Sequence, residues 1–227
     1  MKGKIIKDIR LYKSESQNEF GIPATFSFAD KKLIATTQRI VMKLRENNFS
    51  FGDFDHLYIN FTTCDMAEEI SLSEKTDTYH PWYRYCNVRI DTNSYDNLSS
   101  EENHCKIINY INTILITYFT SEDFDKSKIL TCVKQALDEG EDMLMKFKEK
   151  ITSQRKAIIY LRYLDTCRFY PLLRIYDTEE HLLFEEDLPE TLTLDYIGDI
   201  QISTKRITIK PRKNVLNTEE NAMICEY

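Results

Sequence analysis

The sequence predicts an α+β protein, with an antiparallel sheet that forms a meander in its C-terminal half and packs with about three helices. Three observations support this class. Apolar and polar residues alternate over 55–61 and 82–90, apolar residues recur at helical spacing in three other segments, and closely spaced strand patterns follow Arg155. No segment rich in Pro, Gly or Ser divides the chain, so we expect a single domain spanning 1–227.

The N-terminal region predicts a strand followed by a helix. Residues 4–12 alternate loosely between apolar and polar side chains, as a strand does. Asp30 is of the residue type that caps helix N-termini, and the pattern after it predicts a helix that ends near Asn48. The apolar stripe of this helix, at i, i+3, i+4 and i+7, consists of Leu33, Ile34, Thr37, Ile40, Val41 and Leu44.

The remaining elements are expected to be organised around residues 54–119. A strand over 55–62 is joined to a second strand over 82–90 by a long connection, 63–81, which is mostly acidic. Connections of this length without secondary structure are uncommon in compact domains and are usually functional. A short helix over 66–70 would shorten it.

Two further helices are predicted before residue 150. Ser99 and Glu102 have the spacing of a capping box for the first, and the segment Asp123-Phe124-Asp125 is placed to cap the second, which we expect over 122–150. The first has so broad an apolar face that it should be mostly buried. That face consists of Cys105, Ile107, Ile108, Ile111, Ile114, Leu115 and Tyr118.

The C-terminal region predicts strands over 157–164, 170–176, 181–185 and 200–210. The short connections between these strands favour an antiparallel meander over parallel crossovers. Within 202–207 the alternation slips, which indicates a bulge or a tight turn. The tail after Pro211 carries no clear pattern, and we expect it to be frayed.

Composition excludes several classes of function. The chain has 5 glycines, none of them paired, whereas phosphate-binding loops need closely spaced glycines. A net charge of −7 disfavours nucleic acid as a partner, because phosphate contacts require concentrated Lys and Arg. No apolar run approaches the length of a membrane span, and the charged N-terminal residues do not resemble a signal peptide. The 6 cysteines form no CxxC, which indicates reduced thiols and a cytoplasmic protein.

The sequence contains no recognisable catalytic or metal-binding motif. The 4 histidines are not at ligand spacing with one another or with cysteines, so we expect no cofactor and no metal. An alternative remains open in which carboxylates near Asp53 and Asp55 bind a metal ion in a hydrolase or nuclease-like enzyme.

The distribution of charge is the most unusual feature of the chain. No Lys or Arg lies between Arg174 and Lys205, and a basic cluster follows directly. Acidic and basic side chains could simply pair across a sheet, or the acidic run could attract a basic partner. The acidic run consists of Asp177, Glu179, Glu180, Glu185, Glu186, Asp187, Glu190, Asp195 and Asp199, and the basic cluster of Lys205, Arg206, Lys210, Arg212 and Lys213.

A second candidate contact region combines aromatic and acidic residues. Trp82, Tyr83 and Tyr85 begin the strand that follows the acidic connection, which contains Glu68 and Glu69. Tyr and Trp are frequent anchors of protein interfaces, and they also cover antiparallel sheets as cross-strand pairs. Under the first interpretation, an exposed Tyr83/Tyr85 face beside the acidic loop would contact a partner.

With these features, the chain resembles the bacterial immunity proteins that neutralise polymorphic or contact-dependent toxins. The resemblance lies in residues 54–119 and in the acidic run, and it implies an inhibitor that binds a cognate toxin or another basic protein. A self-associating interaction module that pairs through an edge strand is a further alternative, and the oligomeric state stays open. The residues expected to contact the partner are Glu68, Glu69, Trp82, Tyr83, Tyr85, Glu179, Glu180, Glu185, Glu186, Asp187 and Glu190.

Overall fold

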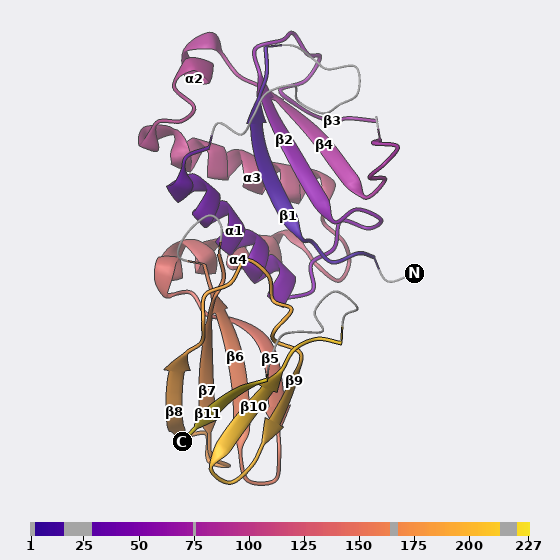
Figure 1. Ribbon diagram of the computed structural model, residues 1–227. Helices are drawn as coiled ribbons and strands as arrows, with labels where there is room; N and C mark the ends of the chain where they lie inside the picture. Colours follow the sequence, from indigo (N-terminus) through magenta and orange to yellow (C-terminus); the bar gives the residue numbers. More distant parts are fainter. Residues whose placement is uncertain (1–2, 16–28, 75, 164–167, 214–221) are drawn as a thin grey trace. The chain divides into compact units, whose positions relative to one another are not determined.

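The computed structural model describes residues 3–15, 29–74, 76–163, 168–213 and 222–227 (Figure 1). The chain divides into two compact units, residues 1–140 and 141–227, which meet in sequence at Gly140. The α+β class is confirmed, while the single domain stays a prediction. In the part of the chain that is described, no helix has the length and apolar character needed to cross a membrane.

The first unit contains a mixed four-stranded sheet. Its strands are β1 (Asp8–Lys13), β2 (His56–Thr62), β3 (Ile70–Leu72) and β4 (Tyr83–Arg89), in the order β1-β2-β4-β3. β2 pairs in parallel with both β1 and β4, and only β3 runs antiparallel to its neighbour. The first parallel pairing is possible because the helix between β1 and β2 carries the chain back across the sheet.

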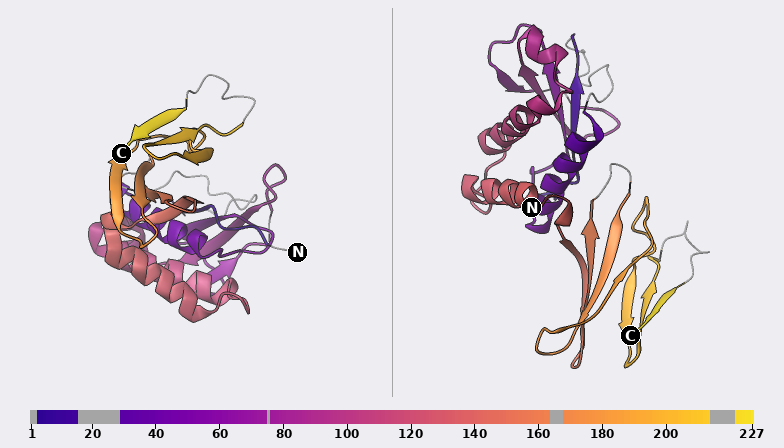
Figure 2. Two further views of the ribbon diagram at one scale, coloured as in Figure 1. Left: turned by 90° about the horizontal axis from the view of Figure 1, so that it is seen from below. Right: turned by 90° about the vertical axis from the view of Figure 1, so that its left-hand side faces the viewer.

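The two faces of this sheet differ sharply in polarity. In register, Ile59 and Phe61 on β2 lie beside Cys86 and Val88 on β4, and this face is covered by α1 (Lys31–Glu46) and α3 (His104–Tyr118) (Figures 1 and 2). The hydroxyl of Tyr118 on α3 donates to the Ile70 carbonyl of β3 at 2.9 Å. Burial of the apolar side chains under the helices directs the alternate residues of each strand to the opposite face.

Side chains cap the helices at their N-termini, as predicted for two of them. Asp30 caps α1 and Asp125 caps α4 (Lys126–Glu139), each by accepting a hydrogen bond from a backbone N–H three residues further on. The expected capping box of Ser99 and Glu102 is wrong. A short 3₁₀ turn, Glu101–Asn103, precedes α3 instead, with Ser100 before it and no side-chain cap. α2 (Thr92–Asp96), which Asp91 caps, has no counterpart among the predicted helices.

The helix predicted over 122–150 is too long. α4 ends at Gly140, whose positive φ of 54° ends the helical path, and a strand, β5 (Met145–Ile151), follows. Leu144 and Phe147 happened to continue the apolar spacing of the helix, although Met145 and Phe147 alternate with lysines as a strand requires.

The second unit is a two-layer antiparallel β-structure, which confirms the predicted meander. One sheet contains β5, β6 (Lys156–Arg162), β7 (Tyr170–Tyr176) and β8 (Leu182–Asp187) in that order. The other contains β9 (Asp199–Ile202), β10 (Arg206–Lys210) and β11 (Met223–Glu226). The core between the two sheets consists of Ala157, Ile159, Leu173, Ile175, Leu188, Ile197, Ile200, Ile207, Ile209 and Cys225.

Three local expectations have clear outcomes. The slip within 202–207 is a tight turn, in which the Ser203 N–H donates to the Arg206 carbonyl at 2.9 Å. The expected helix over 66–70 is wrong, because this segment leads into β3. A frayed tail is wrong for β11, which pairs with β10, while 214–221 lie outside the described residues.

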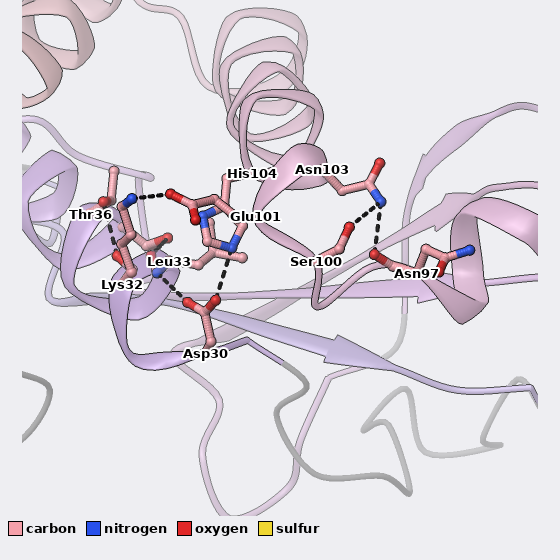
Figure 3. A network of polar contacts seen from close by, with 10 residues as sticks. Asp30, Lys32, Leu33, Thr36, Asn97, Ser100, Glu101, Asn103 and His104 are labelled. Atoms are coloured by element: carbon pink, nitrogen blue, oxygen red, sulfur yellow. Dashed lines mark hydrogen bonds and ion pairs between the residues drawn. The ribbon is translucent and has the colours of Figure 1, made fainter.

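A polar network joins the beginnings of α1 and α3 (Figure 3). Besides capping α1, Asp30 places its Oδ2 3.0 Å from Nε2 of His104, which is buried. Lys32 forms an ion pair with Glu101 just before α3. These contacts align the two helices that cover the sheet, so we interpret the network as structural.

Replacing Ile111 with Asp should unfold the first unit. Ile111 on α3 is 0% exposed, and a buried unpaired carboxylate costs about 3 kcal/mol or more. Thr113→Asp is the matched control, because Thr113 lies on the exposed side of the same helix and should lose under about 1 kcal/mol. Chemical denaturation followed by far-UV circular dichroism measures both. A cooperative, near-native Ile111→Asp protein would contradict the burial of this helix.

Candidate interaction surfaces

A tight turn before β4 presents an aromatic side chain to solvent. In this segment, residues 77–83 (the Tyr79 turn), Oδ1 of Asp77 accepts hydrogen bonds from the backbone N–H groups of Tyr79 at 2.8 Å and His80 at 2.9 Å. The Tyr83 N–H donates to the His80 carbonyl at 3.0 Å. Tyr79 is 86% exposed although the backbone that carries it is held at several points.

The ionised form of Asp77 stabilises this turn. Partial burial of the carboxylate opposes its ionisation, but the two backbone N–H donors and the nearby His80 ring outweigh that effect, so the pKa of Asp77 is lowered. The charge therefore favours the folded turn at neutral pH.

Aromatic side chains of β2 and of the turn itself pack together beside Tyr79. The ring of His80 stacks on Tyr83 with 4.7 Å between centroids, and Tyr83 also contacts His56 at 4.9 Å and Tyr58 at 4.9 Å. Trp82 lies 5.7 Å from His80 and carries Lys4 over its face at 5.3 Å. The stacked rings limit the rotamers of these side chains, so the surface is preorganised.

The expected exposed Tyr83/Tyr85 face is wrong for Tyr85. Tyr85 is only 2% exposed, and its ring lies 5.2 Å from Tyr58 within the sheet face opposite the helices. Burial, with a smaller effect of the Asp77 carboxylate, raises the pKa of Tyr85. Trp82 and Tyr83 are half-buried, and Tyr85 supports them without reaching solvent.

Glu68 and Glu69 do not lie beside this aromatic surface. The Glu69 carbonyl accepts a hydrogen bond from the Arg89 N–H, at the far end of β4 from Tyr83. Six residues of strand separate the two ends by about 20 Å. The side chain of Glu69 accepts a hydrogen bond from Tyr110 on α3 at 2.8 Å, and Glu68 is exposed nearby. The structure thus separates the acidic and aromatic parts of the predicted contact region.

Much of the acidic run in the second unit is engaged in ion pairs within its sheet. Glu185 of β8 pairs with Arg174 of β7, N–O 2.6 Å, and Asp187 pairs with Arg162 of β6, also 2.6 Å. These pairs match the interpretation that acidic residues pair across the sheet. Glu180 pairs with Lys156 and Glu190 with Arg168.

The cations in these ion pairs come from β6, β7 and the connection between them, rather than from the basic cluster after Lys205. One member of that cluster, Lys210, lies opposite Asp199 in the register of β9 and β10. Glu179 is exposed, with a carboxylate oxygen 3.8 Å from the His181 ring. Glu186 lies on the inner side of β8, where burial and this carboxylate raise the pKa of Cys225 to about 12.

The charged side chains of β7 and β8 line a groove in the second unit. Its volume is about 570 Å³. Acidic residues outnumber the two arginines of the groove, and two leucines form its apolar part. The lining consists of Glu141, Asp142, Leu144, Arg162, Leu172, Arg174, Glu185, Glu186 and Asp187.

The carboxylates proposed as metal ligands are arranged differently from a metal site. Asp55 is buried and contacts Nζ of Lys7 at 2.8 Å and Nδ1 of His56 at 2.6 Å, while Asp53 is exposed in a turn. Burial alone would raise the pKa of Asp55, but hydrogen bonds from Lys7 and His56 lower it. Across the described ranges, no three His, Cys, Asp or Glu side chains group together as metal ligands.

The cysteines that the structure describes are all unpaired. Cys64, Cys86, Cys105, Cys132 and Cys225 carry free thiols, and Cys167 lies outside the described residues. Cys105, expected on the buried stripe of α3, is exposed because that stripe is centred on the isoleucines.

Comparisons of the chain with protein-family models, with curated proteins and with solved structures found no match. The resemblance to immunity proteins accordingly stays a prediction.

The predicted contact residues include Trp82 and Tyr83 but not the residues that surround these two in the structure. Tyr79 is not among the predicted contact residues, and neither are His56 and Tyr58. The alternation along β2 indicates that His56 and Tyr58 lie on the same face of the sheet. Their contact with Tyr83 depends on the parallel register of β2 and β4.

Acid should release the Tyr79 turn. Because the pKa of Asp77 is lower in the folded protein, its stabilising effect is complete above the unfolded value of about 3.9 and is lost as the pH falls through the folded value. The backbone amide signals of Tyr79 and His80 in ¹⁵N NMR spectra should therefore move toward random-coil positions below about pH 4.

Asp77→Asn is the control for this titration. An amide oxygen can accept the same two backbone hydrogen bonds without ionising, so the turn should persist without the acid-dependent step. Identical titrations of the two proteins would show that the carboxylate charge does not hold the turn.

Proposed function

We propose that this chain is a protein-binding inhibitor of the immunity type, which captures a cognate toxin domain or another basic protein through the Tyr79 turn. The exposed, preorganised Tyr79 is the observation that carries the proposal. The first unit would provide the main contact, with Trp82 and Tyr83 bordering the turn.

An exposed tyrosine on a constrained backbone favours binding for an energetic reason. Interface hot spots are enriched in Tyr and Trp, because these side chains bury a large area while losing few rotamers. The hydrogen bonds of Asp77 and the stack of His80 on Tyr83 hold the turn before any partner arrives. Little conformational entropy would therefore be lost on binding.

The acidity of the chain supports a basic partner. Its net charge is −7, and Glu68, Glu69 and Glu179 are exposed. Complementary potential accelerates association and selects among partners, although it adds less to affinity than a buried anchor does. In this proposal the protein acts in the cytoplasm, where the free thiols of its cysteines would remain reduced.

A photo-crosslinking residue at position 79 tests the proposal in cells of the native organism. The proposal predicts one dominant crosslinked protein, of basic composition, identified by mass spectrometry. The same residue at position 137 is the control, since Leu137 is an exposed apolar residue on α4 of the same unit. Equal crosslinking from both positions, or none from position 79, would refute the Tyr79 turn as the contact.

With the partner identified, Tyr79→Ser should weaken binding by about 2 kcal/mol, near thirtyfold in Kd, and leave the melting temperature unchanged. Leu137→Ser should leave the Kd unchanged, because position 137 lies on α4, away from the Tyr79 turn in the chain. Inhibition of the activity of the purified partner by the wild-type chain, and its loss in Tyr79→Ser, would separate an inhibitor from a binding protein without inhibitory effect.

A further inference from the structure

The four-stranded sheet of the second unit ends in an edge that is open to another strand. Among the described residues, β8 pairs only with β7, so the backbone N–H and C=O groups on its other side have no strand partner. Leu182 and Leu183 at the beginning of β8 are 50% and 45% exposed. An open edge with exposed apolar side chains is a template for strand addition.

The opposite edge of the same sheet, β5, is protected. Its register with β6 shifts between Lys146 and Lys148, and Lys148 and Lys150 carry charge along the strand. Bulges and lysines are the usual means by which proteins prevent pairing at an edge. In β8 the register shift lies at its first residues, so Phe184–Asp187 continue as a regular strand.

The charges of β8 select what can add to it. Glu185 and Asp187 each use one carboxylate oxygen in the pairs with Arg174 and Arg162, Oε2 and Oδ1 respectively. The other oxygen of each carboxylate can accept a donor from the open side. If a second copy of β8 paired with this edge, the carboxylates of the two copies would repel each other. The lysines or arginines of a basic strand would instead form ion pairs with them.

The groove beside β8 offers space for one basic side chain of such a strand. Leu144 and Leu172 can contact the apolar stem of a lysine or arginine, while Glu141 and Asp142 face its charged end together with the carboxylates of β8. The acidic residues of the groove exceed its two arginines, so an added cation improves its charge balance.

We propose that the edge of β8 accepts an extended segment of a partner protein as a fifth strand, with lysine or arginine at alternate positions. The alternate spacing follows from the strand period, which places these side chains on the face that Glu185 and Asp187 share. The inference rests on the proposed function only in requiring a protein partner, since the Tyr79 turn belongs to the other unit.

A peptide titration of the full chain tests the inference. The probe is a seven-residue peptide of alternating lysine and valine, and a peptide with glutamate in place of lysine is its control. Hydrogen exchange measured by NMR should show new protection of amides in 182–187 with the lysine peptide alone. Absence of binding at millimolar peptide, or protection along β5 instead, would overturn the proposal.

Backbone methylation of the probe distinguishes strand addition from charge attraction. Two peptides are N-methylated, each on one of the two sets of alternate residues, so that only one of them loses the amide N–H groups that face β8. That peptide should bind at least about tenfold more weakly than the unmethylated parent, because each lost hydrogen bond contributes roughly 1 kcal/mol. Equal affinity of both methylated peptides and the parent would show only electrostatic attraction and would overturn the inference.

Variants of the chain complete the test. Glu185→Gln combined with Asp187→Gln should lower the affinity several-fold and flatten its salt dependence, while Lys148→Gln on β5 should change neither. Sedimentation must show a monomer: self-association that protects β8 would assign the edge to a second copy and refute the basic strand.

The inference and the proposed function can fail separately. Peptide binding unaffected by Tyr79→Ser, together with failure of crosslinking at position 79, would remove only the proposed function. Crosslinking at position 79 without peptide binding would remove only the strand addition.

Discussion

The strict alternation of side chains along β2 and β4 is the constraint on which the first unit depends. Leu57, Ile59 and Phe61 must be buried under the helices, so His56 and Tyr58 have to lie on the other face. A shift of one residue in register would exchange the two faces. The surroundings of the Tyr79 turn are thus a consequence of core burial, because the residues that support Tyr83 are the outward alternates of core residues.

Asp77 converts this face into a candidate binding surface. Its carboxylate holds two backbone N–H groups and orients a turn whose outermost residue has no role in packing. A side chain as large as Tyr79 at 86% exposure contributes little to the stability of the isolated chain.

In the second unit, charge and strand order together decide what the surface can do. Ion pairs of β8 with β6 and β7 neutralise Asp187 and Glu185, two residues of an acidic run that looked like one negative patch. Exposed ion pairs of this kind add roughly 0–1 kcal/mol each to stability. In the proposed strand addition their effect would be on specificity, because an edge rich in carboxylates would repel acidic strands and attract basic ones.

The sequence by itself determined the elements with strong local signals: the α1 helix with its Asp30 cap, the alternating strands β2 and β4, and the antiparallel meander. Local signals failed where one pattern fitted two structures, as in β5, where Phe147 together with the preceding Leu144 continued a helical spacing. Only the tertiary structure decided which segments became neighbours. Three features depend on contacts between residues that are distant in the chain. The parallel register of β2 and β4 brings His56 and Tyr58 to Tyr83, and the path of the chain separates Glu69 from Trp82. The order of the strands makes Arg162 and Arg174 the partners of the acidic strand β8. Neither composition nor periodicity encodes such contacts, because composition ignores the order of the residues and periodicity describes only residues that are close together in the chain.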